Sequence, residues 1–308
     1  MKQKMWMLRA SRMLILSLIV PFSAWAQEEH KERGVGDVVY VPTPQIVVDT
    51  MLSMAKVGPK DFVIDLGSGD GRMIITAVKK FGAQGLGVDL SDDLLAEAAR
   101  NAKIEGVADR AIFVKQNLFE TDLTSATIIT TYLLPQMNER LRPKILSMKP
   151  GTRLVAHDYA MGEWSADETR TLDVPEKKVG TAGKSYLFFW TVPAKVAGRW
   201  QAPTRTDSPA SQWEFELGQR FQMLDGVAKN GSETVKLRTM EIKGDQISIM
   251  FLTKPGDNRT RHEFKGVVNG DAISGTLTVG EGAASKQMPW NLKLIQRGEV
   301  KISMATPQ

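Results

Sequence analysis

The sequence predicts an α/β domain with a mainly parallel sheet, followed by a small all-β domain. Within residues 36–193, short apolar runs alternate with helical segments, which is typical of strands joined by helical crossovers. A glycine-rich turn joins the first apolar run to the first helix. Residues 198–297 instead show short strands, glycine turns between them and no convincing helix. The polar, proline-containing stretch 201–211 predicts a loop.

The first 26 residues have the character of a secretory signal. They carry four basic residues, no acidic residue, an apolar stretch at 13–22 and small residues at Ala24 and Ala26. The apolar stretch spans about ten residues, too short to cross a bilayer comfortably as a helix. We therefore expect an exported protein, periplasmic or envelope-associated, that keeps no membrane span after cleavage. An uncleaved anchor in the cytoplasmic membrane is the alternative.

The composition excludes several kinds of site. The net charge is +5, but without the four basic residues of the signal 36 basic and 35 acidic residues remain, so we expect no nucleic-acid partner. The absence of cysteine excludes disulfides, thiolate metal ligands and a cysteine nucleophile. His30, His157 and His262 share no ligand spacing, so we expect no histidine metal site.

The elements of the α/β domain are expected in a regular order. Buried strands are predicted at 62–64, 86–88, 112–114, 127–134 and 153–157, and helices at 72–81, 91–106 and 137–148. Residues 176–181 and 185–192 predict two antiparallel strands around Gly183 that finish the edge of the sheet.

The second domain is expected to be an antiparallel barrel or sandwich. Strands are predicted at 212–217, 220–224, 234–242, 246–252, 261–268, 272–279 and 288–294, with hairpin signals at 229–231, 243–245, 255–257 and 269–271. The opening 198–200 and the closing strand with Trp290 resemble small lipocalin-like barrels. The aromatic side chains are expected in the core rather than on a ligand platform: Trp200, Trp213, Phe215, Phe221, Phe251, Phe264 and Trp290.

The most informative stretch runs from Asp65 to Arg72, between a buried strand and a helix. Glycines allow the tight turn and let backbone N–H groups approach a ligand, and the helix N-terminus favours an electron-rich partner. The spacing differs from the dinucleotide fingerprint, which serves a pyrophosphate. An acidic residue at the strand end suits a ligand with an ammonium group, such as S-adenosyl-L-methionine. The expected cofactor-binding residues of this turn are Asp65, Gly67, Ser68, Gly69 and Gly71.

Two further polar residues follow the next two strands. Asp89 ends the second strand, 24 residues after Asp65, where a carboxylate can accept hydrogen bonds from both ribose hydroxyls. Asn117 follows the third strand, where it is expected to contact the adenine amine; an ordinary loop asparagine is the alternative.

At these residues the sequence resembles a known family. The stretches 40–44, 47–52, 65–72, 132–135, 142–144, 149–153 and 157–158 look like the small protein-lysine methyltransferases that act on the c-type subunit of ATP synthase and on the adenine nucleotide translocase, and like their bacterial relatives. The resemblance covers about half of the chain. It implies a class I methyltransferase with a Rossmann-like seven-strand sheet and S-adenosyl-L-methionine as cofactor. It also implies that Tyr40 and Thr43 lie near the cofactor and substrate entrance.

The catalytic residues are expected at the carboxyl edge of the sheet, where open α/β sheets bind ligands. A lysine acceptor must lose a proton before it attacks, and a nearby carboxylate or tyrosine assists that step. The candidates are Tyr132 and Asp158, with the neighbouring His157 expected more often in packing.

Three functions remain open from the sequence. The first is N-methylation of a protein side chain, with lysine as the expected acceptor. The second is a non-catalytic binding or structural protein of the envelope, because S-adenosylmethionine is made in the cytoplasm whereas the signal indicates export. The third is a small-molecule methyltransferase, with the β domain binding a lipophilic ligand.

Overall fold

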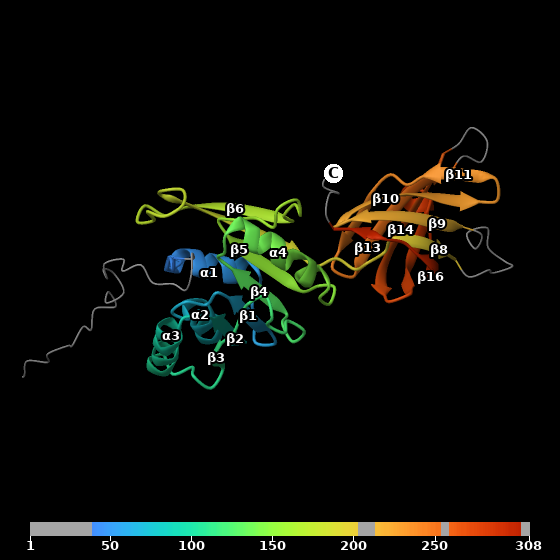
Figure 1. Ribbon diagram of the computed structural model, residues 1–308. Helices are drawn as coiled ribbons and strands as arrows, with labels where there is room; N and C mark the ends of the chain where they lie inside the picture. Colours follow the sequence, from blue (N-terminus) through green and yellow to red (C-terminus); the bar gives the residue numbers. More distant parts are fainter. Residues whose placement is uncertain (1–38, 203–212, 254–258, 303–308) are drawn as a thin grey trace, which may run out of the picture. The chain divides into compact units, whose positions relative to one another are not determined.

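The computed structural model describes residues 39–202, 213–253 and 259–302 (Figure 1). The predicted signal at 1–26, most of the predicted loop at 201–211 and the hairpin signal at 255–257 lie outside the described residues. The chain divides into two compact units, Met1–Tyr40 and Val41–Gln308. The second unit contains two separate sheets, and the division into an α/β and an all-β domain stays a prediction.

The first sheet has seven strands in the order β3-β2-β1-β4-β5-β7-β6. Neighbours from β3 to β5 pair in parallel, whereas β7 pairs antiparallel with both β5 and β6. Its strands are β1 (Phe62–Leu66), β2 (Gln84–Asp89), β3 (Ala111–Lys115), β4 (Ile128–Thr131), β5 (Arg153–His157), β6 (Glu168–Asp173) and β7 (Lys184–Thr191). The predicted α/β class is confirmed, and the strand order reverses between β1 and β4, the position at which open α/β sheets bind their ligands.

Four helices cover the two faces of this sheet: α1 (Gln45–Met54), α2 (Arg72–Phe81), α3 (Asp92–Ile104) and α4 (Pro135–Leu146). The core beside α1 and α2 receives Val63 from β1, whereas the core beside α4 receives Ile64, the next residue along the strand. Successive side chains of a strand point to opposite faces, so a short apolar run fills both cores. The sheet therefore lies buried between two helical layers.

The edge strand β6 differs from the prediction. It runs over Glu168–Asp173 rather than over residues 176–181. Its side chains are almost all exposed, so the strand lacks the apolar pattern that sequence analysis detects. Residues 174–183 form a loop instead, in which Lys177 N donates to Val174 O and Gly183 N donates to Lys177 O. The predicted strand at 127–134 is shorter, Ile128–Thr131, and the helix predicted at 137–148 begins earlier, at Pro135.

The second sheet has ten strands. They are β8 (Gly198–Gln201), β9 (Glu214–Arg220), β10 (Met223–Asn230), β11 (Glu233–Lys236), β12 (Met240–Lys243), β13 (Gln246–Thr253), β14 (Thr260–Asn269), β15 (Ala272–Val279), β16 (Lys286–Arg297) and β17 (Val300–Lys301). The order runs from β11 at one end to β12 at the other, and the described residues show no pairing between these two ends. The structure thus shows an antiparallel sheet, and its closure into a barrel stays a prediction.

The core of the second sheet is aromatic, as predicted. Trp290 stands edge-to-face against Phe215 and Phe264, with ring centroids 5.1 and 5.0 Å apart, and Trp213 packs on Phe251. All seven predicted aromatic residues are buried. Phe221 packs elsewhere, however: its ring is stacked on Trp164, 6.2 Å away, in the core beside α4.

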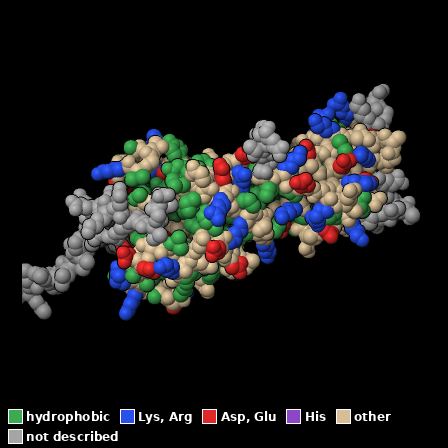
Figure 2. Space-filling view, in the orientation of Figure 1, with side chains coloured by type: hydrophobic (Ala, Val, Ile, Leu, Met, Phe, Trp, Pro, Cys, Tyr) green, Lys and Arg blue, Asp and Glu red, His purple; other side chains and the backbone are tan. Residues whose placement is uncertain are grey.

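The face in Figure 2 shows Lys and Arg side chains interspersed with Asp and Glu side chains. Within the described ranges, no helix is long and apolar enough to span a membrane.

Candidate functional site

The β1–α2 turn reverses the chain within five residues, Gly67–Gly71. Its three glycines have positive φ angles of 84°, 53° and 83°, which side chains rarely tolerate. The backbone N–H groups of Gly67 and Ser68 donate to Val88 O, at 2.9 and 3.0 Å. These two donors are thus used within the protein rather than aimed at a ligand, so the glycines serve the turn itself and its close packing on β2.

Gly71 is the tightest point of the turn. A Cβ placed there would lie 2.6 Å from Cζ of Phe113 on β3 and 2.8 Å from Cβ of Ala98 on α3. Both distances are far below van der Waals contact. The turn, β3 and α3 therefore approach one another closely because position 71 has no side chain.

Asp89 at the end of β2 is held in a fixed orientation. Its Oδ2 accepts a hydrogen bond from Gly69 N at 2.9 Å, and its Oδ1 accepts from Leu90 N and Ser91 N at 2.8 and 3.0 Å. The carboxylate thus connects the glycine turn to the start of α3. This is the place that sequence analysis assigns to a ribose-binding carboxylate.

Asp65 is buried at the end of β1, and the Thr130 hydroxyl donates to its Oδ1 at 2.7 Å. Burial raises the pKa of Asp65 to about 7; the charges of Asp89 and Asp70 act in the same direction, and the Thr130 hydrogen bond acts against them. A buried carboxyl that ionises near neutrality is well suited to an ammonium group, because the added cation stabilises its charged form.

Ser68 provides an unsatisfied polar group in the glycine turn. Its Oγ is buried and has no hydrogen-bond partner among the described residues. Such a group normally bonds to water or a ligand. Together with the carboxylates of Asp65 and Asp89, it makes the turn a fitting site for a polar ligand that carries an ammonium group and a ribose.

Thr43 and Asn117 also lie at this part of the fold. Thr43 is buried, and its carbonyl accepts a hydrogen bond of 2.8 Å from Arg72, the first residue of α2. The Asn117 side chain is used within its own turn, accepting from Phe119 N at 3.0 Å and donating to Glu120 at 3.2 Å. These contacts fit the ordinary loop asparagine, and the adenine role of Asn117 stays a prediction. So does the role of Tyr40, which belongs to the first compact unit.

The predicted catalytic pair lies together at the carboxyl ends of β4 and β5. The Tyr132 hydroxyl donates to Asp158 Oδ2 at 3.2 Å. Burial, together with the Asp158 charge, raises the pKa of Tyr132 well above its usual value, so the hydroxyl stays protonated at neutral pH. The structure thus brings together two residues that are 26 positions apart in the sequence.

His157 packs beneath this pair, with its ring centroid 4.0 Å from that of Tyr132. The imidazole is fully buried, and burial lowers its pKa to about 4, which keeps it neutral. Its Nε2 lies 3.0 Å from the Ser185 hydroxyl. These contacts fit the packing role expected for His157, which stays a prediction.

Asp158 has an unusual backbone. Its φ is 61°, and Tyr159 N donates to His157 O at 2.8 Å across it, which makes a three-residue turn with a strained centre. The main chain is fixed by the bond from Asp158 N to Tyr186 O at 2.6 Å. Tyr186 N donates in return to Asp158 Oδ1 at 3.1 Å. The strain is thus stabilised by pairing with the start of β7.

Sequence analysis missed two residues of this site. Lys177 has a side chain only 4 % exposed, and its Nζ donates to Asp158 Oδ2 at 2.5 Å and to Lys184 O at 2.6 Å. Asn138 on α4 is fully buried and donates to Tyr159 O at 2.9 Å. Asn138 could have been found as a polar residue on the apolar stripe of α4. Lys177 left no comparable signal.

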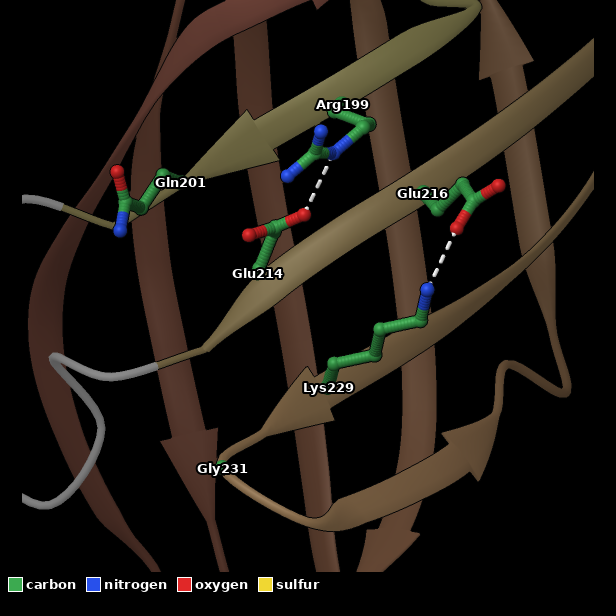
Figure 3. Close-up of a pocket in the computed structure, with 6 residues that line it drawn as sticks. All are labelled: Arg199, Gln201, Glu214, Glu216, Lys229 and Gly231. Carbon is green, nitrogen blue, oxygen red and sulfur yellow. Dashed lines mark hydrogen bonds and ion pairs between the residues drawn. The ribbon is translucent and has the colours of Figure 1, made fainter.

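A hollow lies on the other sheet (Figure 3). Its charged side chains are paired with one another: Arg199 with Glu214 at 2.7 Å and Lys229 with Glu216 at 2.8 Å. The carboxyl edge of the first sheet is therefore the better candidate site. Over the described residues, no cluster of three or more His, Asp or Glu could hold a metal ion.

The chain is similar to several known methyltransferases. Residues 65–168 match the ANTKMT methyltransferase domain. A protein-lysine N-methyltransferase of Saccharolobus islandicus is 47% identical over 133 residues, which cover 42% of this chain and 83% of that protein. The lysine N-methyltransferase of the ATP synthase C-type subunit from Caenorhabditis elegans is 31% identical over 132 residues, 41% of this chain and 69% of that protein.

Two further similarities concern a more distant relative and a solved structure. The adenine nucleotide translocase lysine N-methyltransferase of Mus musculus is 27% identical, over 41% of this chain and 56% of that protein. A solved RNA methyltransferase of Salinibacter ruber, in complex with S-adenosyl-L-homocysteine, is 41% identical over 55% of this chain and all of that chain, with a TM-score of 0.46.

We expect Gly71→Ala to lower the free energy of unfolding by about 2–4 kcal/mol. The new methyl group would clash with Phe113 and Ala98, and it would sit on a backbone with a left-handed conformation. Gly106→Ala is the matched control: it has a φ of 69° and open space around its Cβ position, so about 1 kcal/mol is expected. Urea unfolding measures both. Equal losses would show that packing at Gly71 is unimportant.

We expect the affinity for S-adenosylhomocysteine to rise with pH up to about 7 and then level off. Below the pKa of Asp65 the carboxyl is protonated and cannot pair with the ammonium group of the ligand, so affinity falls by about tenfold for each pH unit. Calorimetric titration between pH 5.5 and 8 would show this slope, and Asp65→Asn should bind weakly at every pH. A flat wild-type profile would remove Asp65 from the ligand site.

Proposed function

The chain belongs to the protein-lysine methyltransferase family of class I, S-adenosylmethionine-dependent enzymes, and from this premise we propose that it methylates the side-chain amine of a lysine in a protein. The observation that carries the proposal is the Tyr132–Asp158 pair, which lies at the same sheet edge as the glycine turn and Asp89. The names of the relatives support a protein lysine as acceptor. A small-molecule acceptor is the alternative outcome of the experiment below.

S-adenosylmethionine supplies an electrophilic methyl group when bound. Asp65, Ser68 and Asp89 are the residues that would hold it. The work left to the chain is to align the acceptor amine, remove its proton and exclude water. The Asp158 carboxylate takes up the ammonium proton, and the Tyr132 hydroxyl orients that carboxylate through its hydrogen bond. Neutral His157 adds no positive charge that would repel the ammonium group.

We expect Asp89→Ala to weaken S-adenosylhomocysteine binding by about 30- to 100-fold, because the change removes two ribose hydrogen bonds and the acceptor that holds Gly69 N. Asp92→Ala is the matched control, because this exposed aspartate pairs with Lys115 at the surface. Wild type and control should transfer tritiated methyl from S-adenosylmethionine to poly-L-lysine, with methyl-lysine found in the hydrolysate. Tight binding without any methyl-lysine would contradict the proposed activity.

We also propose that the protein is exported. The basic start, the apolar stretch at 13–22 and the small residues Ala24 and Ala26 support this. Mass spectrometry of the protein from its host should then find Gln27 as the first residue, in the fraction outside the cytoplasm. A chain that keeps Met1 and stays in the cytosol would contradict export.

A further inference from the structure

The buried Lys177 ammonium lies against the carboxylate that the proposed mechanism assigns to the acceptor. We propose that Lys177 is a pseudosubstrate: its side chain occupies the acceptor-lysine site and must leave before a lysine of another protein can enter. This inference rests on the proposed function, since it assigns the same site to a primary ammonium group at the end of a four-carbon chain.

The contacts of Lys177 are those that an acceptor lysine needs. Its Nζ bonds to Asp158 Oδ2 at 2.5 Å, and the same oxygen accepts the Tyr132 hydroxyl at 3.2 Å. A further bond of 2.6 Å reaches Lys184 O. A carboxylate and a carbonyl thus surround the ammonium group, an arrangement that recognises a charged primary amine and offers a proton acceptor beside it.

This ammonium site adjoins the cofactor edge of the sheet. Tyr132 follows β4 directly, two residues beyond Thr130, whose hydroxyl bonds to Asp65. The next residue, Leu133, packs on the glycine turn: its Cδ2 lies 3.1 Å from the position of a Cβ at Gly67. The segment from Thr130 to Leu133 therefore contacts both the glycine turn and the carboxylate that binds the Lys177 ammonium.

The loop that carries Lys177 is held to the rest of the domain by two buried side chains. In residues 174–183, the buried side chains are those of Val174 and Lys177, and the remaining residues are mostly exposed. Gly180 covers the carboxylate, since a Cβ there would lie 3.2 Å from Asp158 Oδ2. Opening of the loop requires release of the Lys177 ammonium and of Val174, and it would expose Asp158 and Tyr132 together.

The alternative is that Lys177 forms a structural ion pair that fastens the loop. The two interpretations predict opposite kinetics for Lys177→Met, which keeps an apolar chain close to the length of the lysine methylenes but removes the ammonium group. A pseudosubstrate lowers the apparent acceptor affinity by the fraction of time that it occupies the site. A structural ion pair supports the site, so its loss would raise KM or lower kcat.

The experiment measures methylation of poly-L-lysine by the full chain. We expect Lys177→Met to lower the KM for poly-L-lysine by about tenfold, with an unchanged Kd for S-adenosylhomocysteine. Lys178→Met, an exposed neighbour, is the matched control and should keep the wild-type KM. An unchanged or raised KM in Lys177→Met would overturn the proposal.

A chemical complementation makes the test specific for the ammonium group. Lys177→Ala should be inhibited by n-butylammonium in competition with poly-L-lysine, at concentrations that leave the wild type unaffected. The neutral n-butanol should not inhibit. Inhibition that does not compete with poly-L-lysine would overturn the proposal. Failure of the proposed function looks different, because then no variant forms methyl-lysine at all.

Discussion

The site depends on one geometric constraint, the reversal of the chain from β1 into α2 within the five residues Gly67–Gly71. A turn this short requires positive φ at each of its glycines, and it leaves no room for a Cβ at Gly71. Because the turn is so tight, Gly69 reaches Asp89 on the neighbouring strand. The strand ends that carry Asp65 and Asp89 are thus fixed at one edge before any ligand binds, and this preorganisation reduces the cost of binding.

The parts of the fold that sequence analysis predicted are those with a local pattern. Helix α2 and strand β5 begin and end at the predicted residues, because apolar periodicity and glycine boundaries mark them. Strand β6 was missed because its exposed, polar side chains carry no such pattern. Its place in the sheet is determined by pairing with β7, and this long-range pairing leaves no pattern in the residues of β6 itself.

The same distinction applies to the site. Asp65 and Asp89 could be predicted because each follows a recognisable strand, and Tyr132 and Asp158 follow from the same argument. Lys177 could not, since a lysine beside Lys178 in a polar stretch is normally solvated. Its burial depends on Asp158, a residue of another strand end, and on the carbonyl of Lys184. The two carboxyl groups therefore have different partners: Asp158 is paired with the lysine ammonium, whereas Asp65 is bonded to a neutral hydroxyl.

The positive φ of Asp158 limits which amino acids position 158 can accept. Outside glycine, asparagine and aspartate are the residues that enter the left-handed region most readily. Of these three, aspartate alone carries a charge and can take up a proton. Backbone geometry and acid–base chemistry thus select the same residue. Asparagine at this position keeps the backbone conformation but gives up both the carboxylate and the ion pair with Lys177, whereas glutamate keeps the charge but fits the left-handed backbone less well. Asparagine at position 158 would be the expected mark of a relative that keeps this fold and has given up the proton transfer.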